Sequence, residues 1–401
     1  MNEPTPLPRG YSAAGVHCGL KKNDDLDLGL IVAQEAWPAS VLFPRNQLLG
    51  AHVQVCREHL ARSMNMVRAI LVNSGNANCA NGDAGIDAAK TVSKQLAEIL
   101  DCPVEQVLFV STGAIGAPLP TEPIITALPA LVEKLSPDGL EEFAHAIMTT
   151  DTVPKLANIL GEDVEGTPFH IAGVAKGSGM IHPDLATMLA FVMTDGRSTK
   201  DMNFLSRAIA EVSYNRLTID GDQSPNDTVV IWHNENQWFR SSMDDDGIET
   251  DPFNEALTKT CQDLCRKIAA DGEGATRLVT VQVRGASSER EATHVGRTIA
   301  TSPLVKTAIN GRDPNWGRIL SAAGRSGIIF DPGQAKVWIG DADLYSHGRG
   351  HPDNEPIAHQ HLEENNEVII GVDLGLGPYE ADIWSCDMSA DYVKINADYR
   401  T

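Results

Sequence analysis

Short apolar runs alternate with longer amphipathic segments along most of this chain, and glycine-rich or polar stretches separate them. A short apolar run bounded by turn residues is typical of a buried strand, whereas a longer segment with a period near 3.6 favours a helix. This pattern predicts strands over residues 67–72, 106–110, 169–174, 228–232, 278–283, 336–339 and 367–374. It predicts helices over residues 83–100, 140–148, 203–214 and 251–270. The alternation indicates an α/β or α+β fold but does not give the order of the strands.

Two of the predicted strands end in polar loops that contain candidate site residues. The loop Ser111-Thr112-Gly113 follows a strand, where free backbone N–H groups can hold the oxygen anion that forms when a hydroxyl attacks a carbonyl. The alternative is an ordinary strand-to-helix turn capped by Ser111 or Thr112. The loop of residues 73–78 contains three asparagines, and it is either a cluster of amides facing a substrate or an Asn-rich turn.

Length and composition narrow the class of protein. The chain has 401 residues, of which 42% are hydrophobic, and no apolar run approaches the ~20 residues that a membrane span requires. We therefore expect a globular protein of two domains without a membrane partner. Residues 1–9 lack the apolar core of a signal peptide, so we expect the cytoplasm as its location.

Charge and cysteine content argue against a nucleic-acid partner and against a structural zinc site. The formal net charge is -22, which argues against a nucleic-acid partner because phosphate binding requires a basic face. The seven cysteines lack the paired CxxC spacing of structural zinc sites, so we expect reduced thiols and no metal. Cys261 and Cys265 lie one turn apart on a predicted helix, which favours core packing over half of a metal site.

The most informative segment lies near the middle of the chain. Lys176-Gly177-Ser178-Gly179 contains too much glycine for the interior of a helix or strand, which predicts a special backbone conformation with a cation at its entrance. Further on, Thr187 follows Ala186 and opens an apolar stretch. Thr187 is either the cap of a buried element or the first residue after a self-cleavage site. Cleavage there would join a nucleophile and a base in one residue, because the new α-amine, with an ordinary pKa of about 7.7 to 8.0, can take the proton of its own hydroxyl.

Two segments in the second half also suggest a site. Glu273 lies between two glycines just after a predicted helix. Its carboxylate can receive the ammonium of an amino acid substrate or the new amine of Thr187, and the alternative is a solvated loop acid. Residues 305–318 mix charges with Trp316 and two glycines, which indicates either a site loop or a salt-bridged subunit contact.

In combination, these motifs resemble the ornithine acetyltransferase family of arginine biosynthesis. The resemblance runs from about Gly10 to Thr401, and five motifs in the same order carry it. They are residues 73–78, Ser111-Thr112-Gly113-Ala114-Ile115-Gly116, Lys176-Gly177-Ser178-Gly179-Met180 with Ala186-Thr187-Met188-Leu189, Gly272-Glu273-Gly274-Ala275-Thr276, and Asp313-Pro314-Asn315-Trp316-Gly317-Arg318.

The resemblance implies a fold and a set of site residues. The implied fold is a sandwich of β-sheets between helical layers, as in the ornithine acetyltransferase and β-aminopeptidase group. The precursor is expected to cut itself between Ala186 and Thr187, so that an α chain of residues 1–186 and a β chain of residues 187–401 form one site. By the same resemblance Thr187 is the nucleophile, and Thr112 and Gly113 form the oxyanion hole. The implied substrate-binding residues are Thr150, Lys176, Thr187, Glu273, Asn396 and Thr401.

The resemblance also implies an activity. An acetyl group is expected to pass from N2-acetylornithine to Thr187 and then to glutamate in a ping-pong reaction, with no cofactor. Acetyl-CoA is a further candidate donor, and a tetramer of two αβ pairs is the implied assembly. An aminopeptidase or amidohydrolase of the same group would use the same Thr187 but let water resolve the acyl-enzyme. A non-enzymatic binding protein is the broader alternative, and it predicts no cleavage before Thr187.

Overall fold

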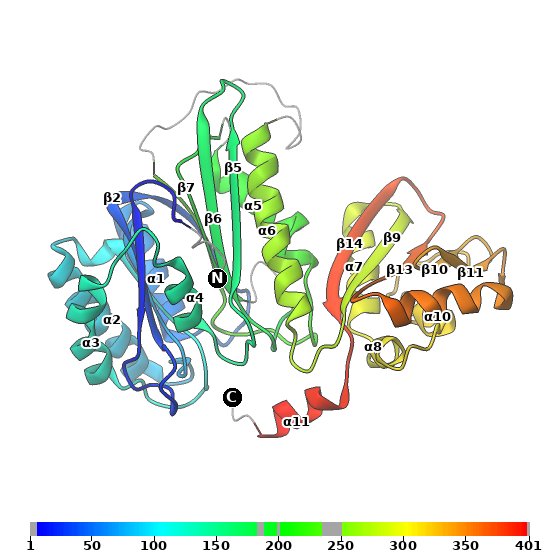
Figure 1. The fold of residues 1–401 in the computed structure, drawn as a ribbon, viewed down its shortest axis with the longest axis horizontal. Helices are drawn as coiled ribbons and strands as arrows, with labels where there is room; N and C mark the ends of the chain where they lie inside the picture. Colours follow the sequence, from blue (N-terminus) through cyan, green and yellow to red (C-terminus); the bar gives the residue numbers. More distant parts are fainter. Residues whose placement is uncertain (1–5, 183–187, 199–200, 235–250, 399–401) are drawn as a thin grey trace.

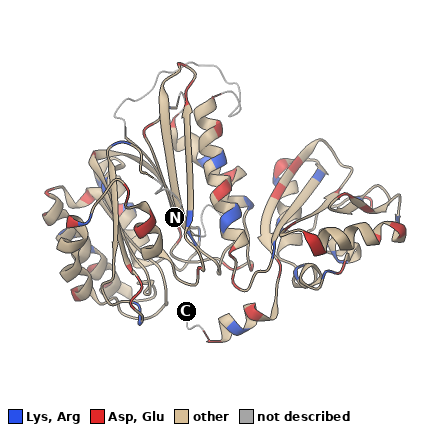
Figure 2. Cartoon of the chain, viewed as in Figure 1, with Lys and Arg blue, Asp and Glu red and all other residues tan. Residues whose placement is uncertain are grey.

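The computed structural model describes residues 6–182, 188–198, 201–234 and 251–398, and its strands form two separate sheets. Figure 1 shows the larger sheet, in blue to green, beside the smaller one, in yellow to red. Each sheet has its own buried apolar core. Charged residues lie mainly on helices and loops, and the strands of both sheets are mostly uncharged (Figure 2).

The larger sheet has eight strands in the order β4-β3-β2-β8-β7-β6-β5, and β1 pairs with β2 beside that path. The strands are β1 (Tyr11–Val16), β2 (Leu28–Leu42), β3 (Met66–Asn73), β4 (Val107–Ser111), β5 (Lys155–Glu162), β6 (Pro168–Lys176), β7 (Leu189–Thr194) and β8 (Thr228–His233). The long strand β2 joins the two halves, because residues 28–32 pair with β3 and residues 39–42 pair with β8. Trp37 and Pro38 also pair with β3, after a register shift between Val32 and Trp37 that lies within the β2–β3 ladder.

Six helices accompany this sheet: α1 (Ala51–Ser63), α2 (Gly82–Leu100), α3 (Thr121–Glu133), α4 (Leu140–Ile147), α5 (Met202–Val212) and α6 (Pro252–Ala270). Successive strand residues face opposite sides, so Leu30 packs with α2 and α3 whereas Ile31 faces the core between the two halves. Phe143 of α4 meets Phe191 of β7 in that core, with their ring centroids 5.6 Å apart. Helices α5 and α6 cover the far side of β6, β7 and β8. The expected mixed α/β fold of sheets and helices is thus confirmed.

The smaller sheet has six strands in the order β12-β11-β10-β13-β9-β14. They are β9 (Leu278–Ala286), β10 (Lys336–Ile339), β11 (Ala342–Ser346), β12 (Arg349–Gly350), β13 (Glu367–Asp373) and β14 (Tyr379–Cys386). Its helices are α7 (Glu289–Ala300), α8 (Pro303–Asn310), α9 (Trp316–Gly324) and α10 (Glu355–Glu364). After β14 the chain leaves this sheet, and α11 (Ala390–Asp398) lies below the larger one in Figure 1.

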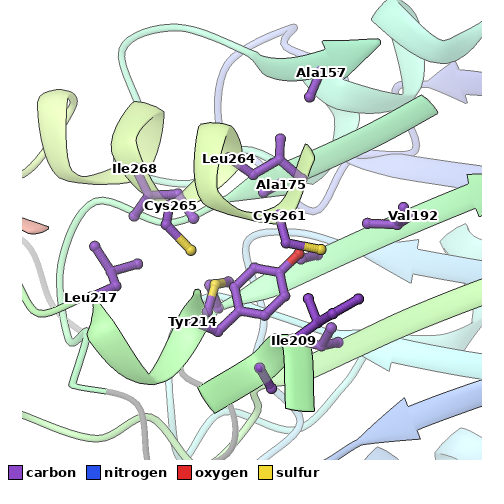
Figure 3. Close-up of a cluster of buried hydrophobic side chains, with 14 of the residues drawn as sticks. Ala157, Ala175, Val192, Ile209, Tyr214, Leu217, Cys261, Leu264, Cys265 and Ile268 are labelled. Atoms are coloured by element: carbon purple, nitrogen blue, oxygen red, sulfur yellow. The ribbon is translucent and has the colours of Figure 1, made fainter. Parts of the chain in front are cut away.

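The two cysteines of α6 belong to the apolar core. Cys261 and Cys265 pack against Tyr214 in a cluster of buried side chains (Figure 3). Burial raises the pKa of the Cys261 thiol to about 12. The prediction that these two cysteines serve core packing is confirmed, and all seven cysteines are unpaired. No helix in the described part of the chain is both long and apolar enough to cross a membrane.

Candidate active site

A cavity of about 140 Å³ opens where the loop after β4, the end of β6 and the start of β7 meet helix α11. Six of the predicted site residues line it: Thr112, Gly113, Thr150, Lys176, Glu273 and Asn396. The other three, Ala186, Thr187 and Thr401, lie outside the described residues. Met188, which follows Thr187 in the chain, also lines the cavity. Residues from both sides of the predicted cleavage site therefore meet at one cavity.

The loop after β4 is fixed by close backbone packing. The Thr112 N–H donates to Asn73 O at 2.9 Å. Gly113 has φ +132°, and a Cβ built on it would lie 2.4 Å from the carbonyl carbon of Gly75. No helix begins in the loop before Thr121, so the alternative of an immediate helix cap is wrong. The neighbouring Asn-rich loop is a structural turn, since its Asn76 and Asn78 amides donate to backbone carbonyls.

The Lys176 ammonium lies at the end of β6 with only 8% of the residue exposed. It donates to Thr149 Oγ1 at 2.6 Å and to Thr112 Oγ1 at 3.3 Å. Burial lowers the pKa of Lys176, and the charge of Asp151 opposes that shift. Lys176 thus ties the loop after α4 to the loop that holds Thr112, and it presents a buried cation to the cavity.

A buried ion network supports this wall of the cavity. Asp151 accepts from Lys155 Nζ and from the Gly177 N–H, both at 2.6 Å. Lys155 Nζ also donates to Asp271 Oδ2 at 2.6 Å. Burial raises the pKa of Asp151, but the charges of Lys176 and Lys155 and the hydrogen bonds to the carboxylate outweigh it, so the pKa lies well below its ordinary value.

Replacing Asp151 with Asn is expected to lower the free energy of unfolding at neutral pH. Removing one partner of a buried ion pair typically costs about 3–5 kcal/mol, and we expect the lower end because Asp271 still pairs with Lys155. A carboxyl with a depressed folded pKa stabilises the protein above its unfolded pKa and loses that contribution as the pH falls toward the folded value. In urea unfolding, the difference in the free energy of unfolding between wild type and Asp151→Asn should stay constant from about pH 7 to about pH 4 and become smaller below that.

The control for this prediction is Asp263→Asn, which breaks an exposed pair with Lys267. Exposed pairs of this kind contribute about 1 kcal/mol or less, so this variant should unfold close to wild type. Equal unfolding of wild type and Asp151→Asn at pH 7 would show that the network is not a source of stability.

The glycine loop after β6 and Glu273 form the opposite wall. Gly177 has φ +145°, which confirms the predicted special conformation, and the Thr150 and Ser178 hydroxyls are hydrogen-bonded at 2.7 Å. The Glu273 N–H donates to Ser178 O at 2.7 Å, and Asn396 Nδ2 donates to Glu273 Oε2 at 2.8 Å. Glu273 is buried, so the alternative of a solvated loop acid is wrong. A Cβ on Gly179 would lie 2.3 Å from Glu273 Oε2, so a side chain at this position would displace the Glu273 carboxylate.

Several residues that line the cavity were not predicted from the sequence. They are Asp220, Asp222, Asn226 and Asp227, from the loop before β8, and Tyr392 of α11. Asp220 accepts from the backbone N–H groups of Met180 at 2.6 Å and Ile181 at 3.1 Å. Burial raises the pKa of Asp220. The available signal was three acids within eight residues, just before the predicted strand at 228–232.

The motif at residues 313–318 lies away from the cavity. Asn315 caps α9, where its side chain accepts from the Arg318 N–H. Trp316 stacks on Tyr345 beside the smaller sheet, with ring centroids 5.0 Å apart. None of these residues lines the cavity, so the expectation of a site loop is not met there. No cluster of His, Cys, Asp or Glu in the described ranges could hold a metal ion.

Comparison with known proteins places this geometry in context. The model of the ArgJ family matches residues 12–401. The sequence is 42% identical to the arginine biosynthesis bifunctional protein ArgJ of Thermosynechococcus vestitus, over 98% of this chain and 97% of that protein. It is 40% identical to the protein of the same description in Caldanaerobacter subterraneus subsp. tengcongensis, over 98% of each chain.

Solved structures of similar proteins match part of the chain. The arginine biosynthesis bifunctional protein argJ of Bacillus halodurans is 37% identical, with a TM-score of 0.48, over 53% of this chain and 100% of that chain. The ornithine acetyltransferase of Mycobacterium tuberculosis, solved with ornithine, is 33% identical, with a TM-score of 0.42, over 46% of this chain and 98% of that chain.

Proposed function

This chain belongs to the ArgJ family and is an acyltransferase of arginine biosynthesis, and we propose that it transfers an acetyl group from N2-acetylornithine to glutamate. The proposal includes self-cleavage into residues 1–186 and 187–401, with Thr187 as the nucleophile. The observation that carries it is that residues from both segments, Thr112, Lys176, Met188 and Glu273, line the same cavity. The cut would fall inside the larger sheet, between β6 and β7.

In the first half-reaction, Thr187 Oγ attacks the acetyl carbonyl and its proton passes to the amine of the same residue. Backbone N–H groups of the Thr112 and Gly113 loop hold the oxygen anion. The bond between the carbonyl carbon and the ornithine nitrogen then breaks, and the Thr187 amine returns the proton to that nitrogen. The enzyme is left with an acetyl ester on Thr187.

In the second half-reaction, the amine of glutamate attacks this ester and N-acetylglutamate leaves. Buried Lys176 is the proposed partner of the substrate α-carboxylate, since it is a compact charge at the cavity wall. Thr150, Glu273, Asn396 and Thr401 are the other proposed substrate contacts. The reaction needs no cofactor, and we propose a heterotetramer of two αβ pairs as the assembly.

The test is a transfer assay with purified protein and N2-acetylornithine. The transferase should release ornithine beyond one equivalent only when glutamate is present, with one N-acetylglutamate formed for each ornithine. Steady release of ornithine and acetate without glutamate would instead support the hydrolase. Acetyl-CoA in place of acetylornithine tests the second donor, and absence of product from either donor would overturn the proposal.

A further inference from the structure

Asp227 is a buried carboxyl with an unsatisfied oxygen. It precedes β8, it is 3% exposed, and it lines the cavity. Its Oδ2 atom is enclosed and has no hydrogen-bond partner in the described structure. The other buried acids of the described structure have no enclosed carboxylate oxygen without a hydrogen-bond partner, and they are Asp27, Asp151, Asp195, Asp251, Glu273 and Asp387. A buried unsatisfied polar group costs about 1–3 kcal/mol, so its presence calls for an explanation.

The neighbours of Asp227 belong to the reacting end of the cavity. The N–H of Thr228 donates to Met188 O at 2.9 Å, so the segment meets the residue that follows Thr187 in the chain. On the other side, Asn226 Nδ2 donates at 2.8 Å to Ser111 O, next to Thr112 of the proposed oxyanion loop. The charge of Lys176 also acts on Asp227, although no ion pair joins Asp227 to a described cation.

The ornithine nitrogen must gain two protons to leave as an ammonium, and the nucleophile supplies only one of them. The amide nitrogen of N2-acetylornithine carries one hydrogen, whereas free ornithine leaves near neutral pH as an ammonium with three. The Thr187 hydroxyl provides the first of the two added protons. In the second half-reaction the need is reversed, since glutamate arrives as an ammonium that cannot attack until it has lost a proton.

We propose that Asp227 is a catalytic residue that carries this second proton, with its free oxygen hydrogen-bonded to the substrate α-nitrogen. In the first half-reaction, the Asp227 carboxyl gives its proton to the departing amine, which leaves as an ammonium and leaves a carboxylate behind. In the second, this carboxylate takes a proton from the glutamate ammonium, and the resulting amine attacks the acetyl ester. The other proton of that nitrogen passes through the Thr187 amine to Thr187 Oγ, so both residues return to their starting state. This proposal rests on the proposed acetyl transfer.

The electrostatics of the cavity suit this role. Burial raises the pKa of Asp227 well above its ordinary value, against the lowering effects of the Ser224 hydrogen bond and the Lys176 charge. A raised pKa lets the carboxyl keep its proton to a higher pH than an exposed aspartate does, which suits a group that first gives a proton and later takes one back. The other titratable groups that line the cavity are Lys176 from β6, Asp220 and Asp222 from the loop before β8, Glu273 after α6, and Tyr392 of α11.

The test compares wild type with the isosteric variant Asp227→Asn in two reactions. Transfer from N2-acetylornithine to glutamate at pH 7 is expected to fall about 10²- to 10⁴-fold, the range of general acid–base effects. The variant's rate should then rise with pH until most of the glutamate is present as the free amine, while wild type changes little. Acetylation by 4-nitrophenyl acetate, whose leaving group departs without a proton, should stay near wild type and also shows that the variant is folded.

A second variant guards against a purely structural effect. Asp227→Ala should regain transfer to glutamate when formate is added, because formate restores a carboxylate in the vacated space. The matched control is Asp195→Asn, a buried acid paired with Arg9 outside the cavity, which should keep the wild-type pH profile.

The outcomes separate this proposal from the reaction on which it rests. Wild-type transfer by Asp227→Asn at pH 7 would overturn the role of Asp227. An equal loss in both reactions with a flat pH profile would also overturn it, and would indicate a carboxyl that only holds an ordered water. Failure of wild type itself to accept acetyl from N2-acetylornithine would instead overturn the proposed function.

Discussion

Purified wild-type protein is expected to give two fragments by intact mass under denaturing conditions, and Thr187→Ala a single chain of 43.1 kDa. The fragment masses should place the cut between Ala186 and Thr187. The reason is chemical: self-cleavage and acetyl transfer both need the threonine hydroxyl, which alanine lacks. Acetyl transfer by Thr187→Ala should therefore fall to background.

The control is Thr187→Ser, which keeps a hydroxyl on the same carbon and is expected to cleave and to transfer acetyl, at a reduced rate. If wild type stays as one uncut species, the proposed nucleophile is lost, and the non-enzymatic interpretation of the sequence gains ground. If both wild type and Thr187→Ala are cut, the hydroxyl of Thr187 is not the agent of cleavage.

The second large effect is expected for Gly113→Ala. At φ +132° an added Cβ would lie 2.4 Å from the Gly75 carbonyl carbon and 2.5 Å from the Asn76 nitrogen, so the loop after β4 must shift. Loss of one oxyanion donor typically lowers turnover about 10²- to 10³-fold. We therefore expect kcat to fall by that factor with little change in KM for N2-acetylornithine, as measured in the transfer assay.

The same loop supplies a matched control. Gly116 also has a positive φ of +85°, but no atom lies within 4 Å of a Cβ built there. Gly116→Ala thus imposes the backbone strain without the close contact, and it should cost some stability while leaving kcat near wild type. Equal kcat losses in the two variants would attribute the effect to strain in the loop and not to a displaced donor.

The sequence predicted the parts of the fold whose signal is local. The strand at 67–72 and the helix at 83–100 appear as β3 and α2, within one or two residues, because each has a clear apolar pattern. The long strand β2 was missed, since Glu35 and Pro38 interrupt its apolar run. Its identity depends on pairing with β3 and β8 at opposite ends, which no local window contains.

The site shows the same limit. Lys176 and Glu273 were predicted as site residues because glycines mark both loops, and glycine reports a backbone demand that is local. Asp227 lies in a polar loop of a kind that is usually solvated. It is buried because Asn226 bonds to Ser111, 115 positions earlier in the chain, and Thr228 to Met188. Such contacts exist only after folding, so no sequence pattern announces them.

The strand order of the larger sheet has a thermodynamic consequence. The two strands from after residue 186, β8 and β7, lie between strands from before it, because β8 pairs with β2 and β7 pairs with β6. If the chain is cut as proposed, complete unfolding yields two molecules instead of one. The apparent melting temperature then depends on protein concentration, and dilution favours the separated pieces. An uncut precursor avoids this penalty, so cleavage after folding would let the sheet form as a unimolecular process.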